Sequence, residues 1–129
     1  KNVIKTTLPK NIKAFDYAPY SEVLPKSACV VHQGGIGTTA QVLRAGVPQI
    51  VIPYSFDQPD NAARVERLGV ALSIGRNEYN AENSFKLLKT ITENRVFSKR
   101  AKEISEKLQA EDGLNESCNV IEKDLNSIK

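Results

Sequence analysis

The sequence of 129 residues contains no tryptophan and no methionine, one histidine and two cysteines. One histidine and the widely separated Cys29 and Cys118 are too few for a zinc site, which needs three or four such ligands. No apolar run approaches the roughly 20 residues that span a bilayer, and no secretory signal is visible, so we expect a cytoplasmic location. The net charge of +3 is small and the basic residues are scattered, which argues against nucleic acid as a partner.

The first residue is Lys1 and not methionine, so we expect this sequence to be a piece of a longer protein. With 40% hydrophobic and 26% charged residues, the composition is that of an ordinary globular protein. This length fits one domain, which we place over residues 1–129.

Short apolar runs alternate with helical patterns along the first part of the sequence. Three runs predict buried strands, at residues 28–32, 48–53 and 71–74. The segments between them predict helices that stop at Gly46 and Gly69, and Asp57 opens the second helix. This alternation predicts an α/β fold, a partial Rossmann-like parallel sheet flanked by helices. A further strand is expected at 11–19, and residues 21–27 are expected to form a short turn or a single helical turn that Pro25 ends.

The remaining residues predict a helical C-terminal tail. A first helix is expected from Asn80 to Glu93, and a second helix runs to Ala110 and is ended by Gly113. Asn115 is expected to cap a last helix. The apolar stripe of that helix consists of Cys118, Ile121, Leu125 and Ile128.

A glycine-rich loop, HQGGIGTT at residues 32–39, lies between a predicted strand and a predicted helix. Ligands of open parallel sheets bind beyond the carboxyl ends of the strands. Glycines let a ligand approach the backbone, and the first amides of a helix lack internal partners and face anions favourably. The loop therefore suits phosphate, to which His32 can donate a ring N–H and Thr38 and Thr39 their hydroxyls.

Other interpretations of these residues stay open. The glycines can serve tight packing alone, and Asp57 can simply cap the helix that follows it. Residues 35–40 also fit the dinucleotide fingerprint G-x-G-x-x-G/A, with Asp57 about 20 residues further on. In that fingerprint the acidic residue ends the second strand, whereas residues 53–56 here lead the chain off the strand first.

A more specific pattern consists of seven short elements that are spaced along the sequence. It begins with an aromatic residue and a proline, and it ends with a Leu-Gly pair. The elements are Tyr17-Ala18-Pro19-Tyr20, Cys29-Val30-Val31, His32 to Thr38, Leu43 to Pro48, Ile50 to Pro53, Asp57 to Ala62, and Leu68-Gly69. The pattern resembles the donor-binding C-terminal half of glycosyltransferases with the two-Rossmann-domain GT-B fold. It is most similar to the UDP-glycosyltransferase family, including its bacterial sterol- and macrolide-modifying members.

The resemblance implies a hexosyltransferase that moves a sugar from a UDP- or dTDP-hexose to an acceptor hydroxyl, with no metal and no cofactor. It assigns the diphosphate to His32, Gly34, Gly35, Gly37 and Thr38. It also assigns the nucleobase to Tyr17 and Tyr20, and the sugar to Asp57 and Gln58. Two positions depart from the family pattern: Tyr20 replaces a glutamine, and Ala40 stands where many members have a glutamate.

The resemblance also places the general base and the acceptor pocket in an N-terminal domain outside this sequence. We therefore expect no catalytic residue here, and a chain that binds nucleotide sugar without turning it over. A small-molecule or lipid acceptor would be reached through the absent domain, and the incomplete sheet predicts an exposed edge that favours self-association. The alternatives are a donor-binding subunit of a two-chain glycosyltransferase and an NAD-type dinucleotide-binding domain.

Overall fold

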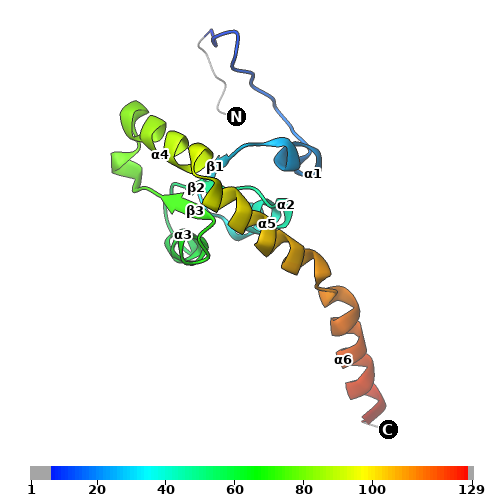
Figure 1. Cartoon of the computed structure of the whole chain (residues 1–129). Helices are drawn as coiled ribbons and strands as arrows, with labels where there is room; N and C mark the ends of the chain where they lie inside the picture. Colours follow the sequence, from blue (N-terminus) through cyan, green and yellow to red (C-terminus); the bar gives the residue numbers. More distant parts are fainter. Residues whose placement is uncertain (1–6, 128–129) are drawn as a thin grey trace.

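The computed structural model describes residues 7–127 and contains a three-stranded parallel sheet with helices packed against it (Figure 1). The strands are β1 (Val30–His32), β2 (Gln49–Val51) and β3 (Ala71–Ser73), in the order β1-β2-β3. Helix α2 (Ile36–Ala45) connects the first pair and α3 (Gln58–Arg67) the second. The register pairs the last residues of all three strands, so their carboxyl ends meet at one edge. The predicted α/β fold with a parallel sheet is confirmed.

The middle strand β2 lies in the core. All three of its residues are buried, including the polar Gln49, and Val51 packs against Ala62 and Val65 of α3. Burial explains why this stretch reads as a continuous apolar run rather than an alternating one. Cys29, which precedes β1, is only half-buried, but burial raises the pKa of its thiol to about 11.

Two helices end at glycines, as predicted. Gly46 follows α2 with a φ of +71° and Gly69 follows α3 with a φ of +73°, a left-handed conformation that glycine adopts without strain. Helix α5 (Arg95–Ala110) packs against the end of α2, where the Ser105 hydroxyl donates to the Arg44 carbonyl at 2.7 Å. This bond gives one of the last carbonyls of α2 a partner.

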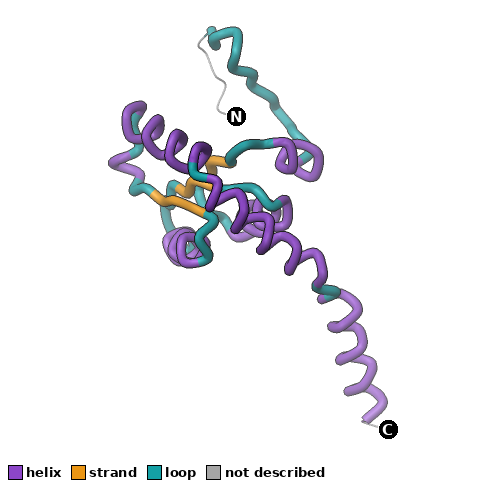
Figure 2. Tube along the Cα trace, in the orientation of Figure 1, coloured by secondary structure: helices purple, strands orange, loops and turns teal. Residues whose placement is uncertain are grey.

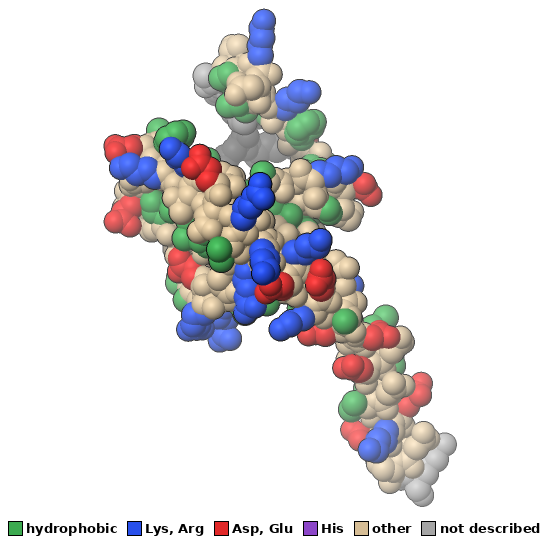
Figure 3. All heavy atoms as spheres, viewed as in Figure 1, with side chains coloured by type: hydrophobic (Ala, Val, Ile, Leu, Met, Phe, Trp, Pro, Cys, Tyr) green, Lys and Arg blue, Asp and Glu red, His purple; other side chains and the backbone are tan. Residues whose placement is uncertain are grey.

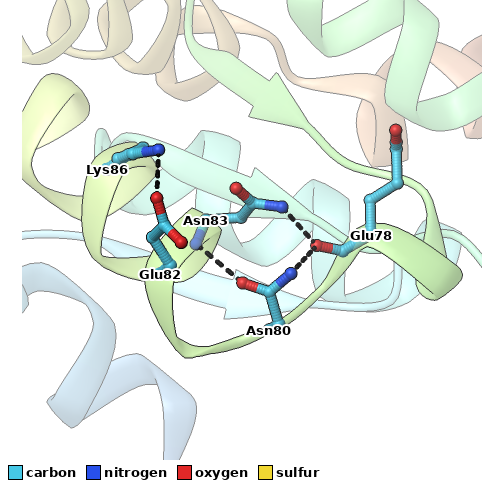
Figure 4. Close-up of polar contacts among 5 residues, drawn as sticks. All are labelled: Glu78, Asn80, Glu82, Asn83 and Lys86. Atoms are coloured by element: carbon cyan, nitrogen blue, oxygen red, sulfur yellow. Dashed lines mark hydrogen bonds and ion pairs between the residues drawn. The ribbon is translucent and has the colours of Figure 1, made fainter.

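Helix α4 (Ala81–Glu93) follows a short 3-10 turn, η2 (Arg76–Glu78), and begins at a polar cluster (Figure 4). The Asn80 side chain accepts a hydrogen bond from the Asn83 backbone N–H at 3.0 Å. The side-chain amides of Asn80 and Asn83 both donate to the Glu78 carbonyl. Lys86 and Glu82 form an exposed ion pair one turn along. The expected helix 80–93 is confirmed, with Asn80 as its N-cap.

The last helix, α6 (Gly113–Ser127), leads away from the sheet (Figures 1 and 2). The prediction that Gly113 ends α5 is wrong: α5 ends at Ala110, and Gly113 is the first residue of α6. The prediction that Asn115 is its cap is wrong as well, because the Asp112 carboxylate accepts from the Asn115 N–H, at 3.4 Å. Asp112 was thus the better acceptor before the first turn.

The expected stripe on α6 faces solvent. Cys118, Ile121 and Leu125 are all exposed, and Ile128 lies outside the described residues. No helix within residues 7–127 is long and apolar enough to cross a membrane. On the face shown in Figure 3, basic and acidic side chains are interspersed over the body, whereas most of the charged side chains along α6 are acidic.

The strand predicted at residues 11–19 is wrong. Within residues 7–19 the structure has a turn and extended loop without strand pairing, and Ile12 and Phe15 are exposed. An alternating pattern forms a strand only beside a partner strand, which this segment does not have among the described residues. The helical turn expected at 21–27 is confirmed as α1 (Tyr20–Val23) and the 3-10 turn η1 (Leu24–Lys26), with Leu24 buried.

Candidate functional site

The loops that follow β1 and β2 touch each other at the carboxyl edge of the sheet. Their contact point is Gly34, whose φ is +88°. A Cβ atom built there would lie 2.7 Å from Val51 Cγ1 and 3.2 Å from the Gln58 carbonyl oxygen. The structure therefore brings the glycine loop beside the Asp57-Gln58 pair, two groups of predicted site residues that are separated in the sequence by β2 and most of α2.

His32, the last residue of β1, is buried at 8% exposure and uses both ring nitrogens within the chain. Nδ1 accepts the Gly34 backbone N–H at 3.0 Å, and Nε2 lies 2.7 Å from Gln49 Oε1. Since Nδ1 accepts, the proton is assigned to Nε2, which donates to Gln49. Burial lowers the pKa of His32, an effect that the bond to Gln49 partly offsets. The imidazole is thus a neutral brace for the glycine loop.

Gln49 is a site-supporting residue that the sequence analysis missed. Its side chain is fully buried on β2, and Oε1 must face His32 because the ring offers an N–H there. Nε2 is consequently left without a hydrogen-bond partner among the described residues, at a cost of about 1–3 kcal/mol. The only local signal is a polar residue inside the apolar run PQIVIP.

The start of α2 offers free backbone donors. The first hydrogen bond of the helix joins the Thr39 N–H to the Gly35 carbonyl, and the Thr39 hydroxyl donates to the same carbonyl. Within residues 7–127, the N–H groups of residues 35–38 make no hydrogen bond. Thr39 is buried and turned inward, whereas Thr38 is half-buried. Four adjacent donors at a helix start form a surface that attracts anions.

Two of the loop glycines are not required by packing. The nearest atom to a Cβ built on Gly35 is Gln33 Nε2 at 3.8 Å, and nothing lies within 4 Å of one built on Gly37. Neither has a positive φ. Gly34 is therefore required by packing, and Gly35 is the N-cap of α2, a position that favours glycine, whereas Gly37 has no such structural role. A helix is less stable with glycine than with alanine, so Gly37 lowers the stability of α2, and no packing contact requires it.

Asp57 and Gln58 each have one side-chain atom bound and one free. Asp57 Oδ2 accepts from Asn61 Nδ2 at 2.7 Å, and Gln58 Oε1 accepts from the Tyr54 N–H at 2.8 Å and the Ser55 N–H at 3.3 Å. Within the described chain, Asp57 Oδ1 and Gln58 Nε2 make no hydrogen bond. The pair thus presents one acceptor and one donor. Asp57 occupies the N-cap position of α3, but its carboxylate caps no backbone N–H.

The two tyrosines predicted to bind a base lie near each other before β1, Tyr17 on a loop and Tyr20 at the start of α1. Tyr17 is 82% exposed, and with Tyr20 it lines a hollow that is also bordered by Gln41 of α2. Gln41 stands about 6 Å along the axis of α2 from Gly37, at 1.5 Å per residue. The hollow and the free amides therefore lie along the same helix.

We expect the stability of the chain to fall as the pH drops below about 6.5 because of His32. Its pKa is lowered from 6.5 in the folded chain, so the unfolded chain binds more protons in the window below 6.5. Stability is complete above that value and is lost as the pH falls toward the folded pKa. Urea unfolding at several pH values measures this. Since the sequence has no other histidine, a His32→Gln variant should give a much flatter profile, and equal slopes would contradict the assignment.

Comparison with known proteins identifies the class of protein to which this chain is similar, and then the family to which it belongs. The glycosyltransferase VinC in complex with DTDP shares the fold with a TM-score of 0.81 at 29% identity, over 91% of this chain and 31% of that one. A family model described as erythromycin biosynthesis protein CIII-like, C-terminal domain, matches residues 2–123. The chain belongs to this family, and the predicted likeness to the C-terminal half of GT-B glycosyltransferases is confirmed.

Two curated relatives illustrate the range of the family. O-mycaminosyltylonolide 6-deoxyallosyltransferase of Streptomyces fradiae is 37% identical over 117 residues, which are 90% of this chain and 28% of the relative. Sterol 3-beta-glucosyltransferase of Saccharomyces cerevisiae is 36% identical over 118 residues, 92% of this chain and 10% of the relative. The chain therefore spans less than a third of the length of these relatives.

Proposed function

We propose that this chain is the donor-binding part of a glycosyltransferase and binds the diphosphate of a UDP- or dTDP-hexose at the start of α2. The observation that supports this most directly is the set of free N–H groups at residues 35–38, bared by two glycines that packing does not require. Glycine at position 37, which no packing contact requires, lets a ligand approach the backbone from outside. A diphosphate matches both the charge preference and the number of donors.

In the proposed reaction the diphosphate leaves the sugar, and the amides stabilise the charge that develops on it. Fixed donors in such a position lower the barrier because they need no reorganisation during the reaction. Gly35, Gly37 and Thr38 would face the diphosphate. His32 would act mainly by holding Gly34, because a direct contact with phosphate requires the ring to release Gln49 or the Gly34 N–H.

The sugar would bind at Asp57 and Gln58. The free Asp57 Oδ1 accepts a hydrogen bond and the free Gln58 Nε2 donates one, which matches two neighbouring hydroxyls of a hexose. Tyr17 would stack on the pyrimidine base, with Tyr20 beside it in the same hollow. The acceptor would be a small molecule or lipid bearing a hydroxyl, as the names of the tylonolide and sterol relatives suggest. The general base would come from the rest of a longer protein.

Titration of the ¹⁵N-labelled chain with UDP, dTDP and NADH tests the proposal. We expect UDP or dTDP at millimolar concentration to shift the amide signals of residues 35–38, since these donors make no hydrogen bond within residues 7–127. Signals of α6, which leads away from the sheet, serve as the internal control. The proposal fails if neither diphosphate moves the loop, and the dinucleotide-binding alternative replaces it if NADH alone does.

A further inference from the structure

The side chain of Asn61 joins the two loops of the site. It is buried at 8% exposure in the first turn of α3. Its Nδ2 donates to the Gly34 carbonyl at 2.9 Å and to Asp57 Oδ2 at 2.7 Å. A carboxamide nitrogen has two N–H bonds, and here one is used on each loop.

Neither bond serves to build α3. The backbone of the helix is satisfied separately, because the Asn61 N–H donates to the Asp57 carbonyl at 2.9 Å. A carboxylate at an N-cap position ordinarily accepts a backbone N–H of the first turn. The Asp57 carboxylate accepts none and turns to Asn61 instead. The contact therefore fixes the carboxylate relative to the glycine loop rather than capping the helix.

We propose that Asn61 is a positioning residue of the donor site, an inference that rests on the proposed function. By holding Gly34 and Asp57 on one small group, it sets the distance between the amides that face the diphosphate and the carboxylate that binds the sugar. In a nucleotide sugar the same distance is fixed by the covalent bond between sugar and phosphate. A site that is already held at that distance loses less conformational freedom when the ligand binds, and it therefore binds the ligand more tightly.

Asn61 should therefore matter more for a nucleotide sugar than for a nucleoside diphosphate. Without Asn61 the glycine loop is still held by the bond from the Gly34 N–H to His32, so diphosphate binding is largely kept. The Asp57 carboxylate, in contrast, loses the only hydrogen bond that it accepts from a side chain in the described chain. We expect Asn61→Ala to lower the preference for the nucleotide sugar about tenfold, as for the loss of one hydrogen bond to a charged group.

The test compares dissociation constants for UDP and UDP-glucose, with dTDP and dTDP-glucose in parallel, by titration of the chain. Asn94→Ala is the matched control, since Asn94 caps α5 by accepting the Val96 N–H at 3.0 Å and its loss weakens the fold outside the site. The control should keep the wild-type ratio of the two constants. Asn61→Ser, which leaves a small polar group in the buried position, is a second variant in case Asn61→Ala does not fold.

A double-variant cycle separates positioning from general stability. If Asn61 acts through Asp57, removing Asn61 from an Asp57→Ala background should change the ratio no further. An unchanged ratio in folded Asn61 variants, or an equal loss in Asn94→Ala, overturns the inference while the proposed function stands. If neither the diphosphates nor the nucleotide sugars bind to the wild-type chain, the proposed function falls and the inference falls with it.

Discussion

Replacing Gly34 by alanine is expected to lower the free energy of unfolding by roughly 3 kcal/mol and to abolish nucleotide binding. The backbone there has a φ of +88°, which costs a side-chain-bearing residue about 1–3 kcal/mol. The added Cβ would also lie 2.7 Å from Val51 Cγ1, and Val51 is completely buried in the core and has little room to move. Urea unfolding measures the loss, and titration with UDP and dTDP measures the binding.

Gly35→Ala is the control for the effect of Gly34→Ala on stability. Gly35 is the next residue, but its φ is −60° and the nearest atom to an added Cβ lies 3.8 Å away. Gly35 is the N-cap of α2, where alanine is less favourable than glycine, so the loss of stability should be no more than about 1 kcal/mol. If both variants are equally stable, Gly34 is not the contact point between the two loops, and the described site geometry is wrong.

Gly37→Ala is expected to have opposite effects on stability and on binding. Gly37 is the second residue of α2 and has open space around its Cβ position, so alanine should stabilise the helix by up to about 1 kcal/mol. The same methyl group would stand between the free amides and a diphosphate. Affinity for UDP or dTDP should fall at least about tenfold, equivalent to the loss of one charge-assisted hydrogen bond.

Gly113→Ala separates the two effects. Gly113 also lies in the first turn of a helix and also has no atom of the described residues within 4 Å of its Cβ position, but it lies on α6. Its alanine variant should gain similar stability and bind nucleotide like the wild-type chain. If Gly37→Ala binds as well as Gly113→Ala, the amides of α2 do not face the ligand, and the proposed diphosphate site is excluded.

Much of the fold could be predicted because its signals are local. The glycines at 46 and 69 mark helix ends through their own backbone conformation, and the apolar run at β2 reports its own burial. Residues 11–19 show the limit of such signals, since a strand depends on a neighbour that local sequence does not reveal. The boundary between α5 and α6 shows another limit: Asp112, Gly113 and Asn115 are all suitable near a helix end, and their order does not say which one caps.

The candidate site was predicted as a set of residues but not as a set of bonds. The glycine loop and the Asp57-Gln58 pair are recognisable from short motifs, and the structure brings them into contact. The hydrogen-bond partners of His32 and Gly34 are not part of these motifs. Gln49 is 17 residues away from His32, and Asn61 is 27 residues away from Gly34. Only the folded sheet makes these residues neighbours, so neither hydrogen bond has a signature in the sequence.

The half-buried position of Cys29 makes the chain convenient to label at a single site. Burial raises the pKa of the Cys29 thiol to about 11, so this thiol is almost entirely protonated at pH 7.5. Maleimides attack the ionised form, so we expect them to modify the exposed Cys118 on α6 much faster than Cys29. A fluorophore or spin probe can thus be attached to the projecting helix without disturbing the strand that leads into the glycine loop.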